Sequence, residues 1–114
     1  MKALFLAALA GVAVLGAPLA HADGDSGNLE ALVGQAYVTY QTRCTPQTPP
    51  SFQGVEWTSG PTGQGGVGTV VDANPSLGGP FTALWDATDA PAGPGEFKVS
   101  DGGSGYWDIA FQFC

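Results

Sequence analysis

Basic side chains are scarce in this 114-residue sequence, which has three Lys or Arg and one His against ten Asp or Glu. Such an acidic chain repels phosphate backbones and anionic lipids, which argues against binding to nucleic acid or to a membrane surface. One His and two Cys are too few to predict a zinc site or a nucleophilic triad. The composition therefore predicts no cofactor and no metal centre, with Ca²⁺ bound at acidic turns as the alternative. The turns concerned contain Asp72 with Asn74, Asp86 with Asp89, and Asp101 with Ser104.

Residues 1–22 have the pattern of a secretory signal peptide. Lys2 is followed by an Ala-rich apolar stretch, Pro18 interrupts it, and Ala20 and Ala22 form a small-x-small cleavage motif. We expect cleavage after Ala22. The alternative is an uncleaved anchor, because the apolar stretch is nearly long enough to span a bilayer. Cleavage would place the protein outside the cell or in the cell envelope, with no stable membrane insertion.

The remaining residues, 23–114, are expected to form one small domain, since 92 residues are too few for two hydrophobic cores. Two basic and ten acidic side chains give this part a formal charge of −8. Gly and Pro make up about a quarter of it, a content that approaches the disordered range. Eleven aromatic residues, three of them Trp, require burial and therefore favour a folded, loop-rich β domain.

One helix is predicted over residues 28–41, where Asn28 is a suitable N-cap. The short polar segment before it, residues 23–28, is expected to be a flexible lead-in. After the helix, three Pro within residues 45–51 predict an extended connector, because Pro is excluded from helix interiors and central strands. The helix prediction depends on an apolar stripe with helical spacing, formed by Leu29, Leu32, Val33, Ala36, Tyr37 and Tyr40.

From residue 52 to residue 114 the pattern alternates with period two, which is typical of strands with one buried side. Gly, Pro, Asn, Asp and Ser fill the intervals as turn residues. Together with the helix, this pattern predicts an α+β fold with one N-terminal helix packed on a small antiparallel sheet or sandwich. The five predicted strands span residues 52–58, 67–72, 81–86, 96–100 and 106–114.

The two cysteines are predicted to form a disulfide, because an exported chain meets an oxidising compartment. Cys44 follows the predicted helix and Cys114 ends the last strand, so the bond would join these two elements. In that strand Trp107, Ile109 and Phe111 share one face, and Cys114 falls on the other. Either the helix packs on the face with the smaller residues, or the chain departs from the alternation before Cys114. The pattern leaves both arrangements open.

Four residues are the candidates for a binding site: Trp57, Glu56, Tyr106 and Asp108. Aromatic rings offer stacking surfaces to sugars and anchors to proteins, and the adjoining carboxylates offer hydrogen bonds. The alternative is that the Trp side chains belong to the core, which is favoured for Trp107 because its whole face is apolar. A Glu56–Asp108 pair would also suit a glycosidase, provided that both carboxylates face one cleft.

The leader ending in Ala20-His21-Ala22-Asp23, the acidic Gly/Pro-rich remainder and the single wide cysteine pair resemble small exported proteins of unassigned function in mycobacteria and related actinobacteria. These features favour a secreted, non-catalytic protein that binds an extracellular ligand or a protein partner. One alternative is a small acid-pair hydrolase acting on envelope glycans. The other is a secreted inhibitor or effector that presents residues 45–51 or 86–95 to a protein.

Overall fold

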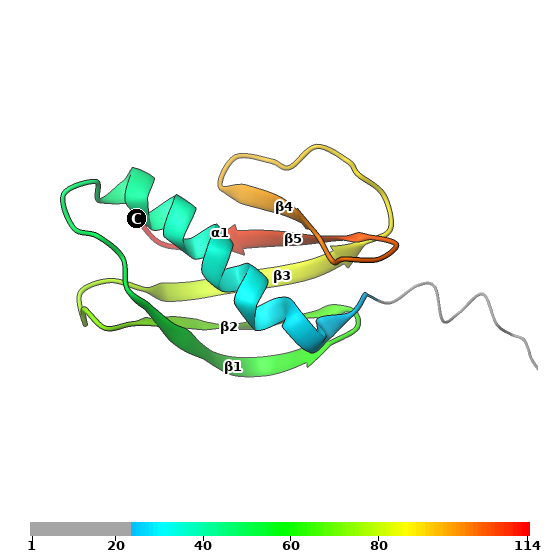
Figure 1. Cartoon of the computed structure of the whole chain (residues 1–114), viewed down its shortest axis with the longest axis horizontal. Helices are drawn as coiled ribbons and strands as arrows, with labels where there is room; N and C mark the ends of the chain where they lie inside the picture. The colour runs from blue at the N-terminus through cyan, green and yellow to red at the C-terminus, as the bar shows by residue number, and fades with distance from the viewer. Residues whose placement is uncertain (1–23) are drawn as a thin grey trace, which may run out of the picture.

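The computed structural model describes residues 24–114, so the predicted signal peptide at residues 1–22 lies outside the described part. A short 3-10 turn, Ser26–Asn28, leads directly into helix α1, Leu29–Cys44. Five strands follow and form one antiparallel sheet in the order β1-β2-β3-β5-β4 (Figure 1). The predicted α+β fold is confirmed, with a single sheet in place of the sandwich alternative. The strands are β1 Phe52–Thr62, β2 Gly65–Asp72, β3 Gly79–Asp86, β4 Glu96–Ser100 and β5 Tyr106–Phe111.

Some element ends differ from the predictions. Helix α1 continues beyond residue 41 to Cys44, and the side chain of Asn28 makes no capping hydrogen bond at its N-terminus. Strand β1 continues to Thr62, through Ser, Gly and Pro residues whose composition predicts a turn. Strand β2 begins at Gly65, where a Cβ atom would lie 1.9 Å from the carbonyl oxygen of Ala83 in β3. Pairing between neighbouring strands therefore overrides local turn composition at this hairpin.

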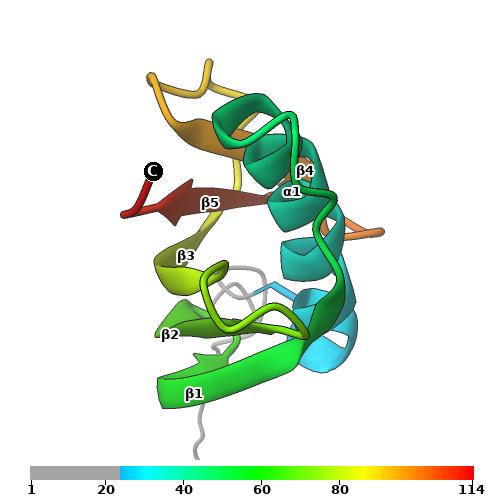
Figure 2. The ribbon, with the colours of Figure 1, turned by 90° about the vertical axis from the view of Figure 1, so that its left-hand side faces the viewer.

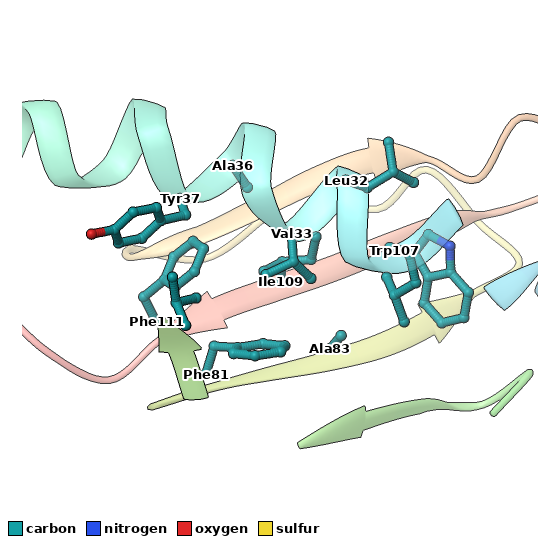
Figure 3. Packing of buried hydrophobic residues seen from close by; sticks show 11 residues of the cluster. Leu32, Val33, Ala36, Tyr37, Phe81, Ala83, Trp107, Ile109 and Phe111 are labelled. Carbon is teal, nitrogen blue, oxygen red and sulfur yellow. The ribbon is translucent and has the colours of Figure 1, made fainter. Parts of the chain in front are cut away.

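Helix α1 covers one face of the sheet, and the hydrophobic core lies between these two layers (Figure 2). At its centre, Val33 and Tyr37 of α1 face Phe81 of β3 and Trp107 and Ile109 of β5, all without solvent exposure (Figure 3). Burial of one large apolar side chain contributes about 1.5–3 kcal/mol to folding. The core is therefore built mainly by the helix and the β3–β5 pair.

The aromatic face of the last strand is the one that α1 covers. Strand β5 ends at Phe111 and not at residue 114, Phe113 still lies on the core side, and the backbone departs from the strand conformation at Cys114, whose φ is 113°. The ring of Phe113 packs edge-on against Tyr40, at 5.5 Å between centroids, and the Tyr40 hydroxyl donates a hydrogen bond to the Phe113 carbonyl oxygen. This departure brings Cys114 to the end of α1, where it is bonded to Cys44. The predicted disulfide is confirmed, and its position explains why Cys114 breaks the period.

Residues ahead of α1 pack against the sheet. The backbone N–H of Gly24 donates a 2.7 Å hydrogen bond to the carbonyl oxygen of Gly63. A Cβ atom on Gly24 would lie 2.0 Å from Cδ1 of Trp85, so the chain approaches the indole closely because this residue has no side chain. Asp25 then accepts a hydrogen bond from the N–H of Gly27 and closes the 3-10 turn. The interpretation of residues 23–28 as a flexible lead-in is therefore wrong from residue 24 onward.

A buried carboxylate ties α1 to the sheet. Asp72, the last residue of β2, accepts hydrogen bonds from the Tyr37 hydroxyl at 2.5 Å, the Ser51 N–H at 2.9 Å and the Asn74 N–H at 2.8 Å. Burial pushes the pKa of Asp72 upward, but these donors outweigh burial and hold its pKa below the usual value. Burial, and then the same carboxylate, raise the pKa of the Tyr37 hydroxyl well above its usual value. Asp72 is thus an ionised structural group at neutral pH.

Candidate functional site

The face of the sheet opposite α1 is covered by no other element within residues 24–114, and we call it the open face (Figure 2). The residues on the open face can be assigned from the strands, because successive side chains point alternately to the core and to the opposite side. An uncovered face of an antiparallel sheet ordinarily carries polar side chains. Here the face also carries exposed apolar side chains on β2 and β3, and its charged groups lie mainly on β3, β5 and β4, with Asp108 directly opposite Leu84. Its side chains include Glu56, Val67, Thr69, Thr82, Leu84, Asp86, Glu96, Lys98, Tyr106, Asp108 and Ala110.

Two of the three most exposed large hydrophobic side chains of the described residues lie at the centre of this face. Leu84 of β3 is 65% exposed and Val67 of β2 is 43% exposed. Leu84 is directly opposite Gly65, and Val67 is directly opposite Thr82, so the two apolar side chains are diagonal neighbours on adjacent strands. Because Gly65 has no side chain, a shallow hollow of about 340 Å³ lies beside Leu84. The centre of the open face therefore carries two exposed apolar side chains beside one shallow depression.

Charged groups border this centre along strands β3, β5 and β4. Lys98 of β4 contacts Asp86 at 3.2 Å and Asp108 at 3.9 Å. Glu96 lies on the same side of β4, two residues from Lys98, and Glu56 lies on β1 at the other margin. The open face therefore carries four carboxylates and one ammonium group, which contacts only Asp86 and Asp108 among them. The open face keeps an excess of negative charge even with both ion pairs formed.

The two carboxylates beside Lys98 have pKa values shifted in opposite directions. Burial, and then the proximity of Glu96, raise the pKa of Asp108, while Lys98 opposes the rise. The pKa of Asp86 is lowered, first by hydrogen bonds from the backbone N–H and hydroxyl of Thr88 and then by Lys98. Lys98 is therefore held mainly by Asp86, and Asp108 is the carboxylate with the less complete set of partners. Oδ1 of Asp108 is buried without a hydrogen-bond partner among the described residues.

The four predicted site residues do not converge on one pocket. Tyr106 and Asp108 lie on the open face at alternate positions of β5, and Glu56 lies on the same face on β1. Trp57 points to the other side, where its ring packs edge-on against Phe81 at 5.4 Å between centroids. A common aromatic and carboxylate site is therefore not assembled, because adjacent residues on a strand point to opposite faces.

The distance between Glu56 and Asp108 also bears on the hydrolase alternative. Their strands, β1 and β5, are separated by β2 and β3. Three strand spacings of about 4.8 Å place the two backbones about 14 Å apart. The paired carboxylates of glycosidases lie about 5–9.5 Å apart. This geometry does not support an acid-pair mechanism for these two residues.

Two of the acidic turns considered for Ca²⁺ have carboxylates that are occupied by internal hydrogen bonds. Asp72 binds Tyr37, Ser51 and Asn74, as described above. Asp101 accepts from the Trp85 indole N–H at 2.8 Å and from backbone N–H groups of the following turn. Within residues 24–114 no group of three or more His, Cys, Asp or Glu side chains is arranged to hold a metal ion. In the same part of the chain, no helix is long and apolar enough to cross a membrane.

Sequence reasoning missed Leu84 and Val67 as functional candidates, although the signal was present. The alternation that groups Phe81, Ala83 and Trp85 on one side of their strand places Leu84 on the opposite side. The sequence pattern does not reveal that this side of the sheet lacks a second layer within residues 24–114.

A scan against protein-family models and searches of curated proteins and of solved structures found no match to this chain. The geometry and chemistry of the open face are therefore the basis for assigning a function.

Proposed function

We propose that this protein is a secreted, non-catalytic binding protein that uses its open face to bind a protein partner. The observation that carries the proposal is the pair of exposed apolar side chains, Leu84 and Val67, on a sheet face without a covering layer. Contiguous apolar surface on a monomeric domain is typical of an interaction site. The hollow beside Leu84 is shallow, which favours another protein surface over a small molecule, since a small molecule requires a deeper cleft.

The charge of the open face indicates the chemistry of the partner. The face carries Glu56, Asp86, Glu96 and Asp108 against Lys98 alone. A second copy of this chain would bring two such faces together, and like charges across an interface are unfavourable. A partner with an apolar patch and surrounding Lys or Arg side chains would complement it. We therefore propose a cationic extracellular or envelope protein as the occupant.

Secretion is part of the same proposal. The leader at residues 1–22 and its resemblance to exported actinobacterial proteins support it, and the Cys44–Cys114 disulfide is of the kind that forms in oxidising compartments. Within the proposal, the disulfide stabilises the domain outside the cell, where the open face meets its partner.

The test compares two charge substitutions at exposed apolar residues on opposite sides of the molecule. Leu84→Glu alters the open face, and Val38→Glu alters α1, where Val38 is 41% exposed. The exported protein and both variants are immobilised, and bound envelope and medium proteins are quantified by mass spectrometry. A candidate partner is then purified, and its affinity is measured by calorimetry at low and high salt.

The proposal predicts a partner whose binding weakens at least tenfold with Leu84→Glu and remains unchanged with Val38→Glu, because burying one Leu is worth about 1.5–3 kcal/mol and 1.4 kcal/mol is tenfold. Binding to a cationic partner also weakens with added salt. If every retained protein binds the Leu84 variant as well as the wild type, the open face is not the binding site.

A further inference from the structure

A second apolar depression lies on the other layer of the molecule, between α1 and the start of β1. Its volume is about 530 Å³, and we call it the α1–β1 groove. Ala31, Gly34, Gln35 and Val38 form one flank at helical spacing, and the half-buried ring of Phe52 forms the other. This stripe is separate from the stripe of α1 that enters the core. The Phe52 ring reaches the helix because Gly34 has no side chain, since a Cβ atom there would lie 2.6 Å from the ring.

The groove adjoins an edge of the sheet. Strand β1 is the first strand in the sheet order, so one side of its backbone has no neighbouring strand within residues 24–114 (Figure 1). The pairing of β1 with β2 is irregular near both ends, between residues 52 and 54 and beyond residue 57. The register is regular over residues 54–57. Irregular pairing blunts an edge against uncontrolled strand addition, so only this short central stretch is suited to a new strand.

A carboxylate lies at the end of the groove nearest to this regular stretch. Glu30 of α1 extends toward β1, where its Oε1 is 3.4 Å from the indole nitrogen of Trp57 and its Oε2 lies beside Gly54. Arg43 is at the opposite end of α1, with its guanidinium over the Phe97 ring at 5.4 Å. The exposed end of the groove is thus anionic because of Glu30, and Arg43 lies too far along the helix to neutralise it. Complementary charge on a ligand would be positive.

We propose that the α1–β1 groove binds an extended peptide segment of a partner protein that adds to the edge of β1. One apolar side chain of the peptide enters the groove, and a Lys or Arg side chain pairs with Glu30. Strand addition supplies backbone hydrogen bonds, and the groove supplies side-chain selectivity. This site lies on the opposite layer from the open face, so it is independent of the function proposed above.

The spacing of the two peptide side chains follows from the geometry of α1. Glu30 and Gly34 are four residues apart, which corresponds to about 6 Å along a helix. Two residues of an extended strand span about 6.6 Å, and side chains two positions apart point to the same face. The peptide motif is therefore an apolar residue and a basic residue separated by one position. Adjacent apolar and basic residues would point to opposite faces and would not fit.

The test uses fluorescein-labelled ten-residue peptides rich in Thr and Ser, titrated with the disulfide-bonded exported protein and followed by fluorescence anisotropy. One peptide carries Leu-x-Arg, and matched controls carry Ser-x-Arg, Leu-x-Glu or adjacent Leu-Arg. We expect measurable binding of the Leu-x-Arg peptide, whether it adds parallel or antiparallel to β1. Each control peptide should bind at least tenfold more weakly. N-methylation of alternate backbone nitrogens on the edge-facing side of the peptide should abolish binding, because those N–H groups donate to β1.

Variants of the protein separate this site from the open face. Val38→Glu should weaken the Leu-x-Arg peptide at least tenfold, and Glu30→Gln should weaken it several-fold and reduce the salt dependence. Leu84→Glu should leave peptide binding unchanged. Circular dichroism and thermal unfolding check that each variant is folded, and all three positions are exposed. Absence of binding below millimolar peptide, equal binding of the controls, insensitivity to N-methylation, or an equal loss with Leu84→Glu would each overturn the proposal.

Discussion

Replacing Tyr37 with Phe removes one hydroxyl group from the contact that joins α1 to the sheet. The Tyr37 ring has no solvent exposure and lies 6.2 Å from the rings of Phe52, Phe111 and Phe113, so the Phe ring can keep the same packing. The loss is the 2.5 Å hydrogen bond to the Asp72 carboxylate. A hydrogen bond to a charged group contributes about 1.5–3 kcal/mol. We expect the free energy of unfolding to fall by that amount, which lowers the Tm by about 10 °C in a domain of this size.

The effect of Tyr37→Phe should depend on pH in a defined direction. The pKa of Asp72 is lower in the folded state than its ordinary value near 3.9, so its contribution to stability is fully present above that pH. The contribution is lost as the pH falls through the lower, folded-state pKa. A protonated carboxyl accepts the Tyr37 hydrogen bond less strongly. The stability difference between wild type and variant should therefore be constant from pH 5 to pH 7 and shrink below pH 4.

Urea unfolding followed by Trp fluorescence measures this difference with the disulfide intact. Tyr106→Phe is the matched control, because Tyr106 is a half-buried residue on the open face whose hydroxyl makes no hydrogen bond within residues 24–114. The control should change stability by less than about 0.5 kcal/mol. If Tyr37→Phe is no more destabilising than Tyr106→Phe at pH 7, the hydroxyl–carboxylate bond does not hold α1 on the sheet.

Three further outcomes follow from the fold. Replacing Cys44 and Cys114 with Ala should lower the free energy of unfolding by about 4 kcal/mol, measured by urea titration, because the bond spans 70 residues; a loss below 1 kcal/mol would contradict it. The free energy of unfolding of Asp108→Asn, relative to that of the wild type, should be higher at pH 7 than at pH 3. Burial raises the pKa of the Asp108 carboxyl, so its ionisation destabilises the folded wild type as the pH rises through that pKa, and Asn has no such cost. Thermal unfolding of Gly34→Ala should show a loss of about 1 kcal/mol despite the better helix propensity, since the new methyl group meets Phe52; in a Phe52→Leu background the same change should become neutral or stabilising.

The periodicity of the sequence determined most of the architecture. The helical stripe from Leu29 to Tyr40 located α1, and the alternating apolar residues located the five strands, because these two periods match the two regular backbones. The cysteine pair could also be predicted, since only two cysteines are present. Element ends were less accurate. Strand β1 runs through a Gly-Pro pair and the chain packs at Gly24, because both depend on contacts with distant residues that local composition does not contain.

The candidate site was decided largely by tertiary structure. The sequence placed Tyr106 and Asp108 on one face of their strand, and this arrangement is present. The sequence did not reveal the strand order, which separates Glu56 on β1 from Asp108 on β5 by two intervening strands. It also did not reveal that Trp57 points toward the core, where it packs on Phe81. The exposure of Leu84 and Val67 and the groove beside Phe52 depend on which side of the sheet α1 covers. That choice is made by burial of the whole aromatic face against the helix, which is a property of the assembled layers.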